Sequence, residues 1–435
     1  MREALKNLVR YWRLYLLTLV LGIGGSFQLG MQVSIMASPA EHIQSFVNQT
    51  WLRRYEVPVS DSTNMLIWSF IVSVFSLGGW VGAIHSGSLP VTYGRKKVLL
   101  FNNIVALVAA VLMVFSPMAK SFEMILLGRF LYGYNAGLGW NVQLMYLGES
   151  SPKKLRGFLT ITITIFSSLG KVTGQIVGIK ELMGTEAMWP WLMALGGLPA
   201  ILQFVTLLFF PEAPRYLYID KGDTEGCRKA LHWLWQEHDL QMEMDEMGKE
   251  RASMQGQNVK TIWDVLTSRC VRWQLLVLVI PCAGVQFCGF NAIYFYAFDI
   301  FGEAGVAEDK MHYLSIGIGT TDLITITLSG IASILPADIF LQAWRPSAYV
   351  ISGSINWLSL FLIGMFFPFL VDGLGQFCFL IFVAYCLFSA VFVLYFIPET
   401  KGKGMVEIMD DFNKLNYKNR GTETEKADFV MATKF

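Results

Sequence analysis

Long apolar runs recur along the chain, each close to the length of a membrane-spanning helix and separated from the next by polar residues. An α-helix rises about 1.5 Å per residue, so ~20 apolar residues cross the ~30 Å hydrocarbon core of a bilayer. The pattern therefore predicts an all-α polytopic membrane protein with about ten spanning helices. The first begins near residue 14, and the others cover 64–84, 98–117, 123–147, 158–178, 189–210, 273–298, 312–335, 347–370 and 376–397.

Basic residues set the expected orientation. Those at 2–13 precede the first run, as in a secretory signal peptide, but the run has no small-residue cleavage site and many more runs follow, so we interpret it as a retained helix. Further basic clusters at 95–97 and 153–156 follow the second and fourth runs, which places both termini in the cytosol. The acceptor tripeptide Asn48-Gln49-Thr50 then lies outside, where Asn48 can be glycosylated.

A polar segment divides the apolar runs into six and four. We expect a cytosolic N-terminus at 1–13, a six-helix bundle at 14–210, a cytosolic helical linker at 211–270, a four-helix bundle at 271–397 and a cytosolic tail at 398–435. Because the linker begins and ends on the cytosolic side, the two sets of helices run in the same sense. Paired halves of this kind are typical of secondary transporters.

Composition narrows the function. The chain of 435 residues is 54% hydrophobic and 15% charged, against about 45–50% and about 25% in soluble proteins. A net charge of +1 does not favour a nucleic-acid partner. The sequence lacks CxxC, HExxH, Walker and GxSxG motifs, and its histidines are dispersed, so we expect no enzyme activity, no metal and no cofactor. The six cysteines lie in spans or the linker and should be free thiols.

Polar side chains form stripes inside the spans. In the fifth span they recur every three or four residues, on one helical face. Single Ser and Thr residues commonly hydrogen-bond between membrane helices, but buried amides beside aromatic rings resemble a pocket for a neutral, polyhydroxylated ligand. The stripes comprise Gln28 and Gln32; Thr160, Thr164, Ser167, Ser168, Lys171 and Gln175; Gln286, Asn291, Tyr294 and Tyr296; Thr320, Thr321, Asp322 and Thr325; and Ser352, Asn356, Trp357 and Ser359.

Six short motifs occur in order with consistent sidedness. They are Gly94-Arg95-Lys96, Gly128-Arg129, Glu149…Arg156-Gly157, Pro211-Glu212-Ala213-Pro214-Arg215, Gly289-Phe290-Asn291-Ala292-Ile293-Tyr294 and Pro398-Glu399-Thr400-Lys401-Gly402. With them, residues 12–416 resemble the facilitative glucose (hexose) transporters, in the sugar-porter branch of the major facilitator superfamily. The resemblance implies a two-bundle fold and downhill hexose transport, most consistent with the plasma membrane.

The resemblance also implies roles for particular residues. Arg95, Arg129, Glu149, Arg156, Glu212 and Arg215 would form a cytosolic gating network, with Asp338 and Arg345 as counterparts in the second half. Gln286, Asn291, Asn356 and Trp357 would contact the sugar, together with Gln32 and Thr164 from the polar stripes. Thr164 stands where the family has glutamine, Gln286-Phe287-Cys288 replaces a Gln-Leu-Ser signature, and Ser333 replaces tryptophan. These departures point to the second, fructose-type class.

Two charged residues within the predicted spans depart from the family. Lys171 lies in the fifth span and Asp322 in the eighth. An isolated charge inside a membrane is costly, so we expect these two side chains to pair if both face the cavity.

The chain is also short for this family, whose members have twelve spans. The eighth span (Ile316–Thr327) runs into Gly330–Leu335, which resembles the end of the family's tenth helix, so about 60 residues, or two spans of ~20 residues with their loops, would be absent. Three functions remain open: a hexose uniporter with an impaired cycle, a transport-inactive form that pairs or competes with a full-length transporter, and, less favoured, a proton symporter. Residues 15–39 contain no Asp or Glu to carry a proton.

Overall fold

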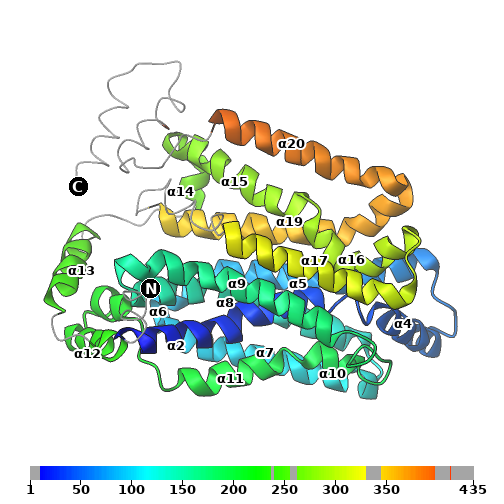
Figure 1. Cartoon of the computed structure of the whole chain (residues 1–435), viewed down its shortest axis with the longest axis horizontal. Coiled ribbons are helices and arrows are strands. Elements are labelled where there is room, and N and C mark those ends of the chain that lie inside the picture. Colours follow the sequence, from blue (N-terminus) through cyan, green and yellow to red (C-terminus); the bar gives the residue numbers. More distant parts are fainter. Residues whose placement is uncertain (1–9, 237–239, 255–261, 330–343, 397–411, 413–435) are drawn as a thin grey trace.

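The computed structural model describes residues 10–236, 240–254, 262–329, 344–396 and 412. Within these ranges every regular element is helical, and the long helices run side by side along one axis (Figure 1). Helices from the first half of the chain, blue to green, fill the lower part of the view, and those from the second half, yellow-green to orange, lie above them.

The first half contains the helices of the six predicted spans. The first span combines α2 (Trp12–Leu21), a π-helical stretch η1 (Gly22–Phe27) and α3 (Gln28–Ser34). The next four are α5 (Asp61–His85), α7 (Arg95–Ala119), α8 (Phe122–Ser150) and α9 (Lys153–Val177), and the sixth is α10 (Trp189–Ala194) with α11 (Gly197–Leu207). Two helices connect spans, α4 (Ala40–Tyr55) and α6 (Leu89–Tyr93).

The polar segment between the two halves, which we call the linker, contains helices, and the second half follows it. The linker contains η2 (Tyr216–Asp220), α12 (Thr224–Trp235), α13 (Gln241–Met254), α14 (Ile262–Thr267) and η3 (Arg269–Val271). The second half comprises α15 (Arg272–Phe287), α16 (Phe290–Glu303), α17 (Glu308–Ser329), α19 (Arg345–Leu374), η4 (Gly375–Phe377) and α20 (Cys378–Phe396). The predicted junction at 330–335 lies outside the described residues.

Eight of the described helical segments are long and apolar enough to span a membrane. Of the ten predicted runs, 123–147 and 312–335 are not among them, although each coincides with a long helix, α8 or α17. Helix α8 is less apolar because it lies inside the bundle. Its buried side chains include Arg129, Asn135 and Gln143, which lower its hydropathy without facing lipid.

Glycine allows the helices of the first half to approach closely. A Cβ added to Gly133 of α8 would lie 1.8 Å from the carbonyl oxygen of Phe75 in α5, and one added to Gly170 of α9 would lie 2.0 Å from the carbonyl oxygen of Phe27. Small residues at such crossings are typical of membrane bundles. The two halves meet where α19 packs against α5 and where α17 packs against α9. These two contacts frame the candidate site.

Candidate transport site and the charged cluster at the bundle end

The seventh span is interrupted at Gly289. Helix α15 ends at Phe287, Gly289 has φ of +81°, and α16 begins at Phe290. This left-handed conformation is strained for residues with a Cβ, and an added Cβ would lie 2.5 Å from the ring of Phe382. The interruption therefore depends on glycine, and it places polar side chains from both sides of the break together.

Three predicted sugar contacts form one hydrogen-bonded group, which we call the amide cluster: Gln286, Asn291 and Asn356. Asn291 Nδ2 donates to Gln286 Oε1 at 2.5 Å, and Gln286 Nε2 donates to Asn356 Oδ1 at 2.5 Å. The cluster joins the broken span to α19. Each amide retains a capacity for further hydrogen bonds, because an amide oxygen has two lone pairs and its nitrogen has two hydrogens.

Trp357 follows the amide cluster in the chain and packs across the interface between the halves. Its ring lies 5.8 Å from that of Phe75, centre to centre, in an edge-to-face arrangement. It also rests on Gly79, where an added Cβ would come within 2.2 Å of Cε3. Trp357 is 7% exposed, so a flat aromatic surface is buried where α5 meets α19.

Two other predicted sugar contacts, Gln32 and Thr164, donate hydrogen bonds to groups outside the amide cluster. Gln32 Nε2 donates to the carbonyl of Met193 at 3.3 Å, so its amide is directed at the sixth span. Thr164 Oγ1 donates to the carbonyl of Ile161 in its own helix at 2.7 Å. The structure thus brings three of the six predicted sugar contacts into one hydrogen-bonded cluster, with Trp357 adjacent to it in sequence.

Lys171 and Asp322 meet across the two halves. Lys171 Nζ of α9 lies 3.1 Å from Asp322 Oδ2 of α17, and the side chains are 13% and 9% exposed. Ser168 Oγ and Tyr294 OH also donate to that oxygen, at 3.3 and 3.4 Å. One carboxylate oxygen therefore accepts from three donors.

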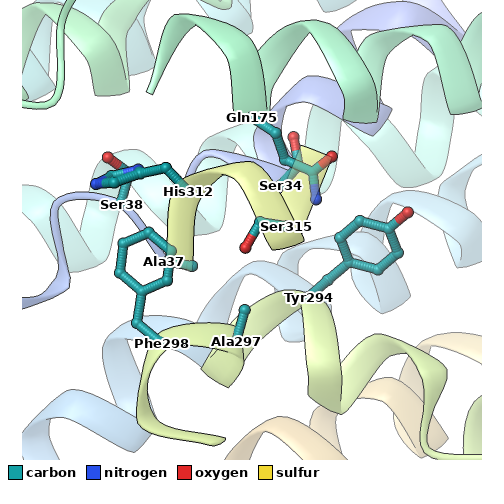
Figure 2. Close-up of a pocket in the computed structure, with 9 residues that line it drawn as sticks. All are labelled: Ser34, Ala37, Ser38, Gln175, Tyr294, Ala297, Phe298, His312 and Ser315. Atoms are coloured by element: carbon teal, nitrogen blue, oxygen red, sulfur yellow. The ribbon is translucent and has the colours of Figure 1, made fainter. Parts of the chain in front are cut away.

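A small pocket is lined in part by Tyr294, which donates to Asp322 (Figure 2). Its volume of about 10 Å³ has room for one water molecule and excludes a hexose. The structure is therefore closed at this position. The pocket is lined by Ser34, Ala37, Ser38, Gln175, Tyr294, Ala297, Phe298, His312 and Ser315.

A charged cluster, which we call the Arg95 cluster, occupies the end of the bundle where α7 begins and α8 ends. Arg95 Nη2 lies 2.6 Å from Glu149 Oε1, and Nη1 lies 2.8 Å from Asp220 Oδ2. The guanidinium also stacks over the Tyr216 ring at 4.7 Å. Nearby, Arg215 Nη2 lies 3.3 Å from Glu243 Oε1. The cluster ties the linker to the first half.

Glu212 caps helix α7 from a distant part of the chain. Its Oε1 accepts from the backbone N–H groups of Arg95 and Lys96, both at 2.9 Å. Helix α7 has no side-chain cap of its own, and a carboxylate at a helix N-terminus is favoured by the unpaired N–H groups and the helix dipole. Gly94, at φ +101°, lets the carboxylate approach, since a Cβ there would meet Glu212 Oε2 at 2.4 Å.

Comparison with known proteins identifies the family. The family model described as "Sugar (and other) transporter" matches residues 17–329 and, in a second stretch, 322–412. This chain belongs to that sugar transporter family. The prediction of a multi-pass transporter rather than an enzyme is thereby confirmed, and so is the resemblance to the glucose transporters.

Individual relatives agree. This sugar transporter is 38% identical to human solute carrier family 2, facilitated glucose transporter member 11, over 96% of each chain, and 36% identical to mouse member 5, over 93% of this chain and 92% of the relative. The alignment with the human protein spans 479 positions, whereas 96% of this chain is about 418 residues, so about 60 positions of that relative have no counterpart here. The two stretches of the family match overlap at 322–329, next to the predicted junction.

Solved structures confirm the two-bundle major facilitator fold. The proton:xylose symporter XylE bound to 6-bromo-6-deoxy-D-glucose superposes with a TM-score of 0.74 at 18% identity, covering 92% of this chain and 99% of that one. The inward open conformation of XylE from E. coli gives a TM-score of 0.71, again at 18% identity, over 91% and 99%.

The transporter's Arg129 lies elsewhere than predicted. It is 20 residues before Glu149 in α8, so ~30 Å of helix separates them and Arg129 cannot reach the Arg95 cluster. Its Nη1 donates instead to the carbonyl of Gln32 at 2.9 Å, its Nη2 donates to the carbonyl of Val72 at 3.4 Å, and the guanidinium lies over Phe75 at 4.7 Å. The prediction that Arg129 joins the cytosolic network is wrong.

The remaining residues predicted for the gating network, and the predicted glycosylation site, lie partly within and partly outside the described residues. Arg156 lies near the start of α9 and is partly buried. Asp338 lies outside the described residues, and Arg345 begins α19, although its side chain is not described. Asn48 lies within helix α4 rather than in an irregular loop, half-buried and two residues from the buried Thr50.

The sequence did not indicate the acidic partners in the linker. Asp220 pairs with Arg95, which is 125 residues earlier in the chain, and Glu243 pairs with Arg215. The available signal was the set of acidic residues in the linker, of which Asp220 follows the Pro211–Arg215 motif by five residues and Glu243 is 28 residues beyond Arg215. That spacing indicates proximity to the motif, but only the fold of η2 and α13 selects which acid meets which arginine.

Proposed function

We propose that this sugar transporter carries a hexose, such as glucose or fructose, downhill by alternating access between its two halves. The amide cluster is the observation that carries the proposal. In the closed state, Gln286, Asn291 and Asn356 hydrogen-bond to one another, so sugar hydroxyls can replace these contacts without leaving the amides unpaired. The buried face of Trp357 offers an apolar surface for a sugar ring.

The Arg95 cluster supplies the gate in this proposal. Its ion pairs hold the linker against the first half at one end of the bundle, and they would separate when that end opens. We assign that end to the cytosol from the basic clusters in the sequence, with both termini on the same side, in the plasma membrane. Arg156 and Glu212, with Asp338 and Arg345 of the second half, complete the proposed network, and the domain boundaries are those predicted from the sequence.

Uptake into proteoliposomes tests the proposal. Purified protein should give saturable entry of labelled glucose or fructose, inhibited by unlabelled hexose and absent for L-glucose. Gln286→Leu should weaken that uptake, while Lys229→Met, at an exposed side chain of the linker helix α12, serves as the control. Well-folded protein without saturable uptake of either hexose would refute transport by this chain.

The unmatched positions of the human relative support a second candidate function. About 60 positions of the human relative have no counterpart here, and alternating access relies on two comparable halves. A transport-inactive chain could then act as a homo-oligomer or by pairing with a full-length transporter. Co-expression that lowers the full-length protein's uptake, without uptake by this chain alone, would favour that function. A proton symporter would instead accumulate sugar under an inward proton gradient.

A further inference from the structure

The Lys171–Asp322 ion pair lies at the contact between the two halves. Lys171 is 18 residues beyond the start of α9, which places it ~27 Å from the end of that helix that adjoins the Arg95 cluster. Tyr294, which donates to Asp322, lies one helical turn beyond Asn291 of the amide cluster in α16. The pair is therefore on the far side of the amide cluster from the Arg95 cluster.

Lys171 makes three contacts with the second half of the chain. Besides Asp322, its Nζ lies over the ring of Tyr294 at 4.7 Å and over that of Phe290 at 5.4 Å. Both rings belong to α16, just after the break at Gly289. A cation placed over aromatic faces is attracted by their electron density, most strongly where water is excluded. One side chain of the first half thus binds α17 and the broken span together.

Polar contacts continue along the same line, which we call the seam: Ser168, Lys171 and Gln175 of α9 face Ser315, Gly319 and Asp322 of α17. Gln175 is one turn from Lys171, and its Oε1 would lie 2.0 Å from a Cβ on Gly319. Gln175 and Ser315 both line the small pocket (Figure 2). The seam therefore runs from the ion pair into a space for one water molecule.

We propose that Lys171 and Asp322 form an ion-pair gate that keeps the seam between the halves closed on the side of the amide cluster away from the Arg95 cluster. Opening this side must separate α9 from α17, which breaks the pair. Either charge alone in a low-dielectric interior is costly, so separation has to be accompanied by water entering the seam. The pair then sets how often the amide cluster opens in this direction.

The gate also holds the helix next to the predicted junction. Helix α17 packs mainly against α9, and it is the last helix before the predicted junction. An attraction across the seam fixes α17, and through Tyr294 the start of α16, on the first half. Lys171 and Asp322 thus act as positioning residues for the proposed sugar contacts of the broken span.

The test measures how fast the seam opens. Ser315→Cys introduces a thiol in the pocket, where the native side chain is 6% exposed. A water-soluble maleimide is applied to the purified full chain in lipid nanodiscs, so both faces are accessible, and labelling of protein without Ser315→Cys is subtracted. The probe is combined with a neutral pair (Lys171→Met with Asp322→Asn), with a reversed pair (Lys171→Asp with Asp322→Lys), or with neither.

The neutral pair should be labelled at least ~5-fold faster than the probe alone, the lower end of typical coupling between two states. The labelling rate of the reversed pair should return to within about twofold of the rate for the probe alone. Unchanged labelling in the neutral pair, or equally fast labelling in both variants, would overturn the gate. If the neutral pair does not fold, Asp322→Asn alone must show the acceleration, and its absence there also overturns the gate.

A matched control uses an exposed ion pair. Lys229 and Glu225 of α12 lie 2.7 Å apart with side chains 75% and 78% exposed, and Lys229→Met with Glu225→Gln should leave the labelling rate unchanged. Labelling does not require a complete transport cycle. The gate can therefore be upheld in a chain that moves no sugar, and sugar uptake can occur in a chain whose labelling refutes the gate.

Discussion

Replacing Gly79 by alanine tests the contact between the halves most directly. The new Cβ would lie 2.2 Å from Cε3 of Trp357, whereas carbon atoms in contact are about 3.5–4.0 Å apart. The indole must therefore retreat by more than ~1 Å. Phe75 packs against the same ring at 5.8 Å, and Trp357 is 7% exposed, so there is little room for this movement.

Overpacking of this kind destabilises a core by about 1–3 kcal/mol. The matched control is Gly148→Ala in α8, where an added Cβ meets nothing within 4 Å. Alanine in an unobstructed helix position should instead stabilise by about 0.5–1 kcal/mol. The melting temperature of each variant can be measured by heating detergent-solubilised protein and analysing it by fluorescence-detected size exclusion. Gly79→Ala should melt below the parent protein, and Gly148→Ala should melt at or above it.

A double substitution isolates the cause. Trp357→Leu is destabilising by itself because it removes buried aromatic surface, but adding Gly79→Ala to it should then have a smaller effect than in the parent. The difference is the coupling between the two positions, which contacting residues show and distant ones do not. Equal melting of Gly79→Ala and Gly148→Ala, or additive effects in the double variant, would refute the packing of α5 against α19 described above.

Three further outcomes are expected. Arg95→Met leaves the Glu149 carboxylate buried and unpaired, so it should destabilise the fold by about 3–5 kcal/mol, and Glu149→Gln should recover part of that loss in the same melting assay. Gln286→Leu leaves two amides unpaired and should raise the KM for hexose uptake roughly tenfold, and an unchanged KM would contradict the role of the amide cluster. Burial, aided by Asp223, raises the pKa of Cys227 to about 11, and the side chain is also closed to solvent, so its alkylation at pH 8 should be at least about 100-fold slower than in unfolded protein and should rise with pH.

In the seventh span, the spacing of two polar residues in the sequence does not explain their contact in the structure. Gln286 and Asn291 are five residues apart, a spacing that does not place two side chains on one face of a regular helix. They meet because the helix stops at Gly289, whose left-handed φ allows α16 to restart at a different angle. The spacing alone does not bring the two amides together, because the angle of the restart depends on packing against residues such as Phe382.

For Arg129, the prediction was wrong although the sequence spacing was sufficient to correct it. Its motif resembled the charged motifs at the cytosolic end, and charge alone does not distinguish one end of a helix from the other. The 20 residues between Arg129 and Glu149 did contain the answer, since a continuous helix separates them by ~30 Å. Its carbonyl partners on Gln32 and Val72 could not be read from the sequence, because backbone acceptors are present at every residue.

The sequence by itself determined the membrane environment, the lengths of the apolar runs and the family. These depend on local or summed properties, since the free energy of placing ~20 residues in hydrocarbon adds up along the chain whatever the helices touch. Tertiary structure decided which polar groups meet. Lys171 and Asp322 were suspected to pair, but they are 151 residues apart, and only the crossing of α9 and α17 brings their charges to 3.1 Å.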